Sequence, residues 1–417
     1  MEIQSSPKGF TKLKSSCHPT KLFVCISLLF ITIVLFHLQV YSFYSPYSYS
    51  PTSASRNFLR KWRGINIVDV ASDDRDHSKN TDANLTSKLR DSVTFLPLED
   101  LRFAETAMVE HTWFMSSLND TYGENEAEHL YFPSETSKGR HLCMKGSNRA
   151  DGTKNSYALA WPESLPDSAT LLKGLTFVSD TYYDYGNLWH GLTAMAPFVG
   201  WSIKNGWLRP NRWVLFHWGE LRDKKGSWLQ HLMQAGFGKV EVENFERGDG
   251  PYCFEKAVVM RHNEGRMGKA RKLQVFDLLR CKARSFCGIN PAGKAQEVNE
   301  RGQPIIRLAL LMRKGSRSCK NATAVIDIFA KECARVEGCV LKVVQSEDLS
   351  FCDQVRVMNE TDIVASPHEA QLTNMLFMGR NSSVMEFFPK GWLELAGVGQ
   401  YAHHWMADQS GMRHQGA

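Results

Sequence analysis

Residues 362–389 decide the predicted fold, and their sequence is Asp362-Ile-Val-Ala-Ser-Pro-His-Glu-Ala-Gln-Leu-Thr-Asn-Met-Leu-Phe-Met-Gly-Arg-Asn-Ser-Ser-Val-Met-Glu-Phe-Phe-Pro389. The apolar run after the first Asp is long enough only for a buried strand, and residues 384–388 predict another. Between them, Ser366 can cap a helix and Glu369 completes a capping box. Strand, helix and strand in this order form half of a nucleotide-binding α/β layer, in which the free N–H groups at the helix start suit an anion. An ordinary αβ unit without a ligand has the same pattern.

Alternating strand and helix patterns on either side of this stretch predict an α/β protein with a parallel sheet. One helix with an apolar face follows Asn187, which can cap it, so His190 lies in its first turn. The predicted strands are at residues 157–160, 175–178, 212–216, 258–260, 305–312 and 340–344, and a further helix is at residues 325–336.

A chain of 417 residues is longer than one hydrophobic core usually organises, so two domains are expected. Its content of 43% hydrophobic and 11% aromatic residues indicates a globular protein. The net charge of +6 comes without a dense Lys/Arg tract, which argues against a nucleic-acid partner. The predicted parts are a cytoplasmic tail at residues 1–21, a transmembrane signal-anchor at 22–40, a flexible stem at 41–91, an N-terminal domain at 92–262, a linker at 263–303 and a C-terminal domain at 304–417.

Residues 22–40 are apolar, contain no Asp, Glu, Lys or Arg, and are numerous enough to span a bilayer as one helix. Lysines precede this run, whereas few basic residues follow it closely, so the N-terminus is expected to be cytoplasmic and the rest of the chain luminal. A cleaved signal peptide is the alternative, although its apolar core is usually shorter.

Two further patterns favour a luminal location. Sequons for N-glycosylation follow the apolar run at Asn84, Asn119, Asn321, Asn359 and Asn381. Eight of the ten cysteines also follow it, and an even number fits four disulfides. No Cys-x-x-Cys pair occurs, which argues against a zinc site, and no metal or other cofactor is expected.

The segment His368-Glu-Ala-Gln-Leu-Thr-Asn374, followed by Glu386-Phe-Phe-Pro389, resembles a motif of glycosyltransferase family 61. That motif is His-Gly-Ala-Gly-Leu-Thr-Asn with a strand of the type Val-x-Glu-x-Phe-Pro after it. Glu369 stands where the family has Gly. The resemblance is specific over these residues and looser from about residue 165 to the end.

The resemblance implies a GT-B-like fold, in which two Rossmann-like domains face each other after the transmembrane helix and the stem. The acceptor approaches from the N-terminal domain, and the C-terminal domain binds the nucleotide-sugar. The implied donor-binding residues include His368, Thr373, Asn374 and Glu386. Glu386 would hold ribose hydroxyls, and the helix start at His368 would face the diphosphate.

A second segment, Asn187-Leu-Trp-His190, resembles the Asn-x-x-His segment of the same family, although Ala194 stands where an acid is often found. The resemblance implies that the catalytic base is His190 or a carboxylate such as Asp184 or Asp180, with His190 favoured. A buried histidine bonded to a carbonyl group is the structural alternative for His190.

Arg313, Lys314 and Arg317 follow the predicted strand at residues 305–312. They lie at its carboxyl end, where open α/β sheets bind ligands. Because the guanidinium fork meets phosphate oxygens at two points, this cluster is predicted to neutralise the donor diphosphate in place of a metal ion. A solvated basic turn is the alternative.

The resemblance implies a single-pass type II glycosyltransferase of the Golgi membrane. It would move a pentose or an N-acetylhexosamine from a UDP-sugar to a polysaccharide or glycoprotein acceptor, with inversion and without a metal. The alternative is a catalytically impaired or truncated luminal binding protein of the same fold. Ala194, Glu369 and the end of the chain at Ala417 favour that alternative, because the family usually continues past this point.

The predicted topology can be tested by glycosidase treatment of the expressed full chain. A luminal body with several sequons should carry N-glycans, so endoglycosidase should increase its electrophoretic mobility while the protein stays in the membrane fraction. An unshifted band, or full release into the medium, would contradict the anchored luminal topology.

Overall fold

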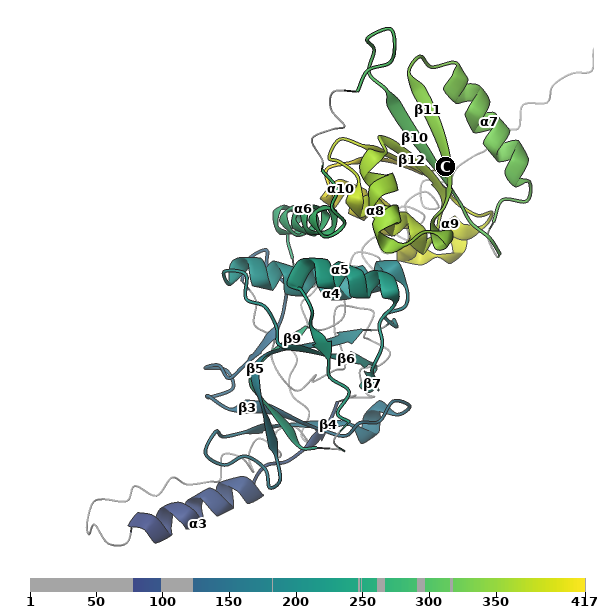
Figure 1. Ribbon diagram of the computed structural model, residues 1–417. Helices are drawn as coiled ribbons and strands as arrows, with labels where there is room; N and C mark the ends of the chain where they lie inside the picture. The colour runs from purple at the N-terminus through teal and green to yellow at the C-terminus, as the bar shows by residue number, and fades with distance from the viewer. Residues whose placement is uncertain are drawn as a thin grey trace, which may run out of the picture. The chain divides into compact units, whose positions relative to one another are not determined.

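The computed structural model (Figure 1) describes residues 78–98, 123–181, 183–246, 248, 250–260, 267–290, 297–315 and 318–416. The predicted tail, the anchor at residues 22–40, most of the stem and the sequon at Asn119 lie outside these ranges. Among the helices within them, none combines the length and the apolar character that crossing a membrane needs. Residues 76–417 form one compact unit of the chain.

The N-terminal sheet has nine strands within the described residues, in the order β1-β4-β3-β9-β5-β6-β7, with β2 beside β9 and β8 beside β6. Parallel pairing joins β5 to β6, β5 to β9 and β6 to β8, and the other pairs are antiparallel. The strands are β1 (Leu96–Pro97), β2 (Leu130–Phe132), β3 (His141–Lys145), β4 (Ser156–Ala160), β5 (Thr170–Thr181), β6 (Arg212–His217), β7 (Glu220–Arg222), β8 (Glu241–Val242) and β9 (Tyr252–Met260).

A Rossmann-like N-terminal half was predicted, and this sheet corrects it. The four strands predicted in this half lie within β4, β5, β6 and β9, but only the central part of the sheet is parallel. Antiparallel neighbours need no crossover helix, and only a three-residue 3-10 helix, Gly152–Lys154, lies between β3 and β4. The short strands β1, β2, β3, β7 and β8 escaped prediction because they lack a long apolar run.

The C-terminal sheet is parallel throughout its five described strands, in the order β11-β10-β12-β13-β14. Apolar runs flanked by helices dictate this arrangement, and the strands predicted there match β10 to β13. The strands are β10 (Ile306–Met312), β11 (Cys339–Gln345), β12 (Ile363–Pro367), β13 (Ser383–Phe387) and β14 (Arg413–Gly416). The parallel α/β prediction for this half is confirmed.

The helices are those of an α/β protein, and most follow a strand. Asn187 caps α4 through its side chain, as predicted, and Pro197 lies inside that helix without ending it. Helix α6 lies within the predicted linker. The α-helices are α3 (Ser78–Asp91), α4 (Leu188–Lys204), α5 (Ser227–Phe237), α6 (Lys269–Phe286), α7 (Ala322–Ala334), α8 (Phe351–Glu360), α9 (Trp392–Leu395) and α10 (Ala402–Gln409), and the short 3-10 helices are η2 (Gly152–Lys154), η4 (Ser346–Asp348), η5 (Ala370–Phe377) and η6 (Gly397–Tyr401).

Two local predictions were wrong. The helix expected to begin at Ser366 is η5, whose N-cap is Glu369. Strand β12 continues through Pro367 and stays in register with β13, so its backbone is committed to the sheet. A residue before proline avoids helical angles, which explains why Ser366 remains extended. In addition, α3 occupies the end of the predicted flexible stem.

One hydrophobic core runs from the N-terminal sheet to the C-terminal sheet. Buried side chains of α4, α5 and α6 pack in the same cluster as those of α8 and η5. Leu372, Met375, Leu376 and Phe377 of η5 are inaccessible to solvent. The sequence around the predicted motif is therefore buried between the helices of the two sheets.

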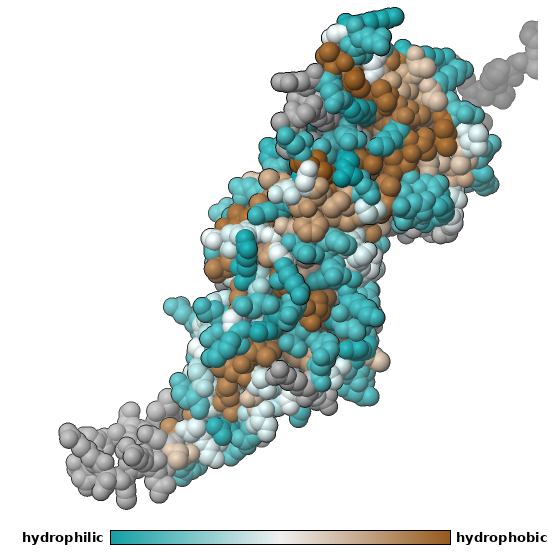
Figure 2. Space-filling view, viewed as in Figure 1, coloured by the Kyte–Doolittle hydropathy of each residue, from teal (hydrophilic) through white to brown (hydrophobic). Residues whose placement is uncertain are grey.

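The outer part of the C-terminal sheet is less covered. Figure 2 shows apolar surface over this part of the molecule, where α7 and β11 expose Ile328, Val340 and Val343. Strand β11 lies at one edge of its sheet.

The eight described cysteines form three disulfides and not the four expected from their even number. The pairs are Cys143–Cys253, Cys287–Cys352 and Cys333–Cys339, and Cys281 and Cys319 are free. The first pair joins neighbouring strands β3 and β9, and the second joins α6 to α8.

The disulfide pairing predicts that replacing paired cysteines lowers stability more than replacing the two free ones. Removing Cys143 and Cys253 together should lower the free energy of unfolding by about 2–5 kcal/mol, because a cross-link that closes 110 residues restricts the unfolded chain. Denaturant unfolding under oxidising conditions measures this loss. The matched control, replacement of Cys281 and Cys319 by Ala, should change stability little. An equal loss of stability in the control would indicate that Cys281 and Cys319 form a fourth disulfide.

Candidate functional site

The carboxyl ends of the parallel strands gather most of the residues predicted for donor binding. Arg313 and Lys314 follow β10, η4 follows β11, and His368 and Glu369 follow β12. In open α/β sheets this edge is where ligands bind. The sheet therefore brings residues that lie far apart in the chain to one edge, as the strand order predicts. Arg317 lies outside the described residues.

The centre of this edge is the carboxylate of Glu386, which is completely buried. Nδ1 of His368 and Nδ1 of His403 lie 2.5 Å and 2.7 Å from its Oε1. Nε2 of His414 lies 2.7 Å from its Oε2. Both oxygens of Glu386 thus have imidazole partners, whereas the resemblance assigns this carboxylate to ribose hydroxyls.

Electrostatics in this cluster favour the ionised carboxylate. Burial alone would raise the pKa of Glu386, but hydrogen bonds from the three imidazoles outweigh it and hold this pKa well below its usual range. Burial lowers the pKa of His403, against the opposing effect of Glu386. The ionised carboxylate is therefore favoured over the carboxylic acid at this fully buried position.

The basic residues at the strand ends already have acidic partners. The guanidinium of Arg313 forms an ion pair with Glu369, and both side chains are mostly buried. Nζ of Lys314 lies 2.8 Å from Oδ2 of Asp348, and its backbone N–H donates to Glu347. The predicted diphosphate site thus has about as many acidic as basic groups.

Thr373 and Asn374 are buried in η5 and connect parts of the structure. Nε1 of Trp228 in α5 donates to Oδ1 of Asn374 at 2.8 Å, and Nδ2 of Asn374 donates to the carbonyl of Gln371. Because buried amides need such partners, Asn374 has a clear structural role between the two sheets. The geometry places neither residue on an open surface.

The start of α4 carries the predicted base. The ring of Tyr183 stacks on that of His190, with centroids 3.9 Å apart and an interplanar angle of 17°. Trp189, the preceding residue in the helix, meets His403 edge-on at 6.1 Å. The first turn of α4 therefore adjoins the histidines around Glu386, which brings predicted residues of both halves into one region.

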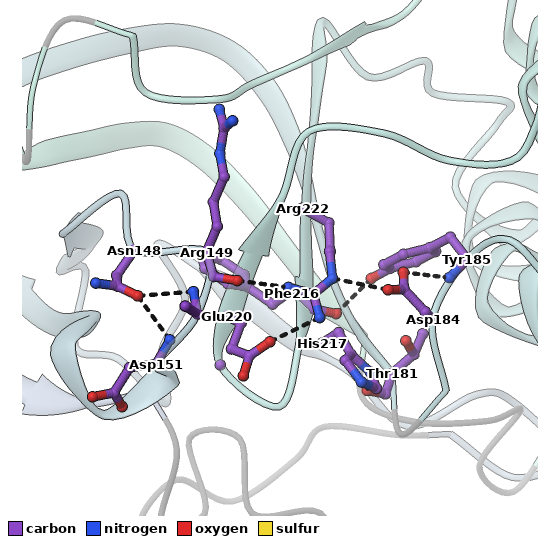
Figure 3. Close-up of polar contacts among 12 residues, drawn as sticks. Asn148, Arg149, Asp151, Thr181, Asp184, Tyr185, Phe216, His217, Glu220 and Arg222 are labelled. Atoms are coloured by element: carbon purple, nitrogen blue, oxygen red, sulfur yellow. Dashed lines mark hydrogen bonds and ion pairs between the residues drawn. The ribbon is translucent and has the colours of Figure 1, made fainter.

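Asp184 belongs to a charged network beside the ends of β5 and β6 (Figure 3). Its Oδ2 accepts from Nε of Arg222 at 3.0 Å, and Arg222 also pairs with Glu220 at 2.8 Å. The backbone N–H of Tyr185 donates to Oδ1 of Asp184. Both oxygens of Asp184 are thus occupied, and Asp180 is buried at the end of β5.

His217 was missed from the sequence. It ends β6 and pairs in register with Thr181 at the end of β5 (Figure 3). Its Nδ1 lies 3.1 Å from the carbonyl oxygen of Thr181, a contact that leaves Nε2 as the acceptor nitrogen. Burial lowers the pKa of His217, which favours the neutral imidazole. Its place after a predicted strand was the signal that could have identified it.

Comparison with known families identifies the class of protein. Residues 180–385 match the model described as Glycosyltransferase 61. The chain is a member of glycosyltransferase family 61. The matched region extends from the end of β5 to β13, so it includes α4 and most of the parallel sheet. Comparison with curated protein sequences finds no match.

Family 61 membership confirms the resemblance seen in the sequence. It points to a glycosyltransferase with a sugar donor and a glycan acceptor as its partners. The roles of individual residues in this family 61 protein remain predictions, as do the sequons. Of these, Asn84, Asn321, Asn359 and Asn381 are described, and Asn321 uses its side chain to cap α7. Asn359 is buried.

Proposed function

We propose that this family 61 protein transfers a pentose or an N-acetylhexosamine from a UDP-sugar to a polysaccharide or glycoprotein acceptor. The observation that carries this proposal is the family match over residues 180–385, which covers both the start of α4 and the carboxyl edge of the parallel sheet. A GT-B arrangement, with donor on the parallel half and acceptor on the other, fits this division.

In the proposed donor complex, Arg313 neutralises the diphosphate and Lys314 adds a second positive charge. To do so, Arg313 must exchange its partner Glu369 for a phosphate oxygen. The guanidinium fork suits this exchange because it makes two parallel bonds to a phosphate. Charge on the leaving UDP is then stabilised by cationic side chains, without a catalytic metal ion.

Transfer proceeds by one displacement with inversion. The acceptor hydroxyl loses its proton to Nε2 or Nδ1 of His190 as its oxygen bonds to the anomeric carbon. The bond from that carbon to the diphosphate oxygen breaks, and its electron pair leaves with UDP. Asp184 is the alternative base, but its ion pair with Arg222 makes it the less available of the two.

The proposal includes a single-pass type II location in the Golgi membrane, with the catalytic part in the lumen. The apolar run at residues 22–40, the basic residues before it and the later sequons support it. The three disulfides fit an oxidising compartment.

A catalytically impaired binding protein is the second candidate. Glu369 occupies Arg313 at the place proposed for the diphosphate, and both oxygens of Glu386 are bonded to imidazoles. A protein with these features could hold a glycan acceptor without transferring sugar to it.

A transfer assay separates the two candidates. Radiolabelled UDP-sugars are offered with xylan and glycoprotein acceptors, and labelled product is expected with one donor. His190→Gln should lower kcat by about 10²–10⁴, because the reaction loses its general base. The control His231→Gln changes a partly exposed histidine of α5 that bonds the carbonyl of Ser227, and its activity should stay unchanged. UDP binding without transfer by the unaltered chain would favour the binding protein.

The ion pair between Arg313 and Glu369 predicts that one substitution will strengthen UDP binding. Glu369→Gly frees Arg313 and removes a charge that would repel a nearby phosphate by roughly 3 kcal/mol at 5 Å and an effective dielectric of 20. We expect UDP to bind several-fold more tightly, with stability lowered by about 1 kcal/mol through loss of the ion pair. Titration calorimetry and denaturant unfolding measure the two effects.

Two further variants complete this test. Arg313→Ala should weaken UDP binding by about 1.5–3 kcal/mol. Glu337→Gly removes the same charge from an exposed pair with Arg301 and should leave UDP affinity unchanged. Equal or weaker binding by the Glu369→Gly protein would show that the diphosphate does not approach Glu369.

A further inference from the structure

The cluster around Glu386 has the composition of a metal site. Its four side chains come from four segments: the end of β12, β13, α10 and β14. One ligand atom each from His368, Glu386 and His403 lies within 4.8 Å of the others, and all three residues are buried. His414 adds a third imidazole at 2.7 Å from the second carboxylate oxygen. We propose that His368, Glu386 and His403 bind one Zn²⁺ ion, with His414 supporting the carboxylate, and that this ion fixes the C-terminal segment to the parallel sheet.

Charge is the first argument for an ion. The side chain of Glu386 has no exposed surface, and its described hydrogen-bond partners are imidazoles, with no Lys or Arg among them. With neutral histidines the cluster buries one uncompensated negative charge, which is costly in a protein interior. A divalent cation at the common point of these ligands removes that cost.

The donor atoms are the second argument. Zinc binds imidazole nitrogen and carboxylate oxygen at about 2.0–2.2 Å in tetrahedral geometry, which separates its ligand atoms by roughly 3.3 Å. The distances of 2.5 and 2.7 Å from Nδ1 of His368 and Nδ1 of His403 to Oε1 of Glu386 therefore need to widen by less than about 1 Å. Two nitrogens and one oxygen supply three protein ligands, and a water molecule would take the fourth tetrahedral position, while His414 holds the other carboxylate oxygen.

His403 supplies the third argument. It is buried in α10, and its Nε2 has no hydrogen-bond partner among the described atoms. Packing alone would favour an apolar side chain at such a position, because an unsatisfied buried nitrogen is unfavourable. A bond from Nδ1 to the ion would offset this cost, although it leaves Nε2 itself without a partner among the atoms that the structure describes.

This site differs from the expectation of no metal, which rested on the missing Cys-x-x-Cys pair. The histidines lie 17, 18 and 28 residues from Glu386, so no short motif could reveal them. The proposed ion is structural and stands apart from the proposed sugar transfer, which uses no catalytic metal. Zinc binding can therefore be tested without an activity assay.

The experiment uses the purified full chain, stripped with a chelator and titrated with Zn²⁺ alone. Bound zinc after dialysis should reach one ion per chain, and the thermal unfolding temperature should rise. His403→Gln and His414→Gln should each weaken zinc binding at least about tenfold. The control His231→Gln alters a histidine of α5 outside the cluster and should bind zinc normally.

Each other outcome would overturn the site. Absence of bound zinc, or normal binding by His403→Gln, would show that hydrogen bonds alone hold the cluster. Loss of zinc in His231→Gln would show that zinc binds elsewhere than at Glu386. If the variants do not fold, Co²⁺ titration of the unaltered chain decides the question. One equivalent should produce the visible absorption of tetrahedral cobalt, and a spectrum typical of octahedral cobalt would contradict the proposal.

Discussion

The continuous apolar contact between η5 and the helices of the N-terminal sheet is the constraint on which the arrangement of this protein depends. Leu372, Met375, Leu376 and Phe377 are all inaccessible, and at roughly 1.5–3 kcal/mol for each fully buried side chain their burial is a large stabilising term. Two directed contacts orient this interface: Trp228 donates to Asn374, and Nε of Arg280 donates to the carbonyl of Leu376. Residues of η5 can approach a ligand only where this segment emerges from the buried apolar contact.

The η5 segment emerges from this apolar contact at Glu369, where charged side chains determine the local contacts. Strand β12 extends through Pro367, so His368 turns toward Glu386 and away from the helix start, and Glu369 becomes the cap that meets Arg313. Two carboxylates, Glu386 and Glu369, thus order the carboxyl edge in different ways. Glu386 is held by hydrogen bonds to imidazoles in the interior, whereas Glu369 neutralises a cation near the surface. The first fixes the fold of the C-terminal segment, and the second sets how strongly an anion can compete.

Much of the fold could be predicted from the sequence where a local pattern is compatible with only one structure. The strands β10 to β13, the cap at Asn187 and the placement of Arg313 at a strand end follow from apolar runs and local capping chemistry. Predictions failed where tertiary pairing overrode a local pattern, as at Ser366, whose capping motif lost to strand register. The antiparallel strands and the histidine cluster were beyond prediction, because both depend on contacts between distant segments that carry no shared local pattern. His217 was overlooked although its position after a predicted strand was visible.

The departure from the family motif at Glu369 has more than one physical effect. A glycine there would leave the start of η5 without a side-chain cap and Arg313 without a partner, so the strand ends would carry an uncompensated positive charge. Such a charge attracts a diphosphate but disfavours the empty protein, since a mostly buried guanidinium needs an anion. The glutamate supplies that anion from within the chain. Stability of the empty site and affinity for an external phosphate therefore oppose each other at one residue, and the ion pair shifts the balance toward the empty protein.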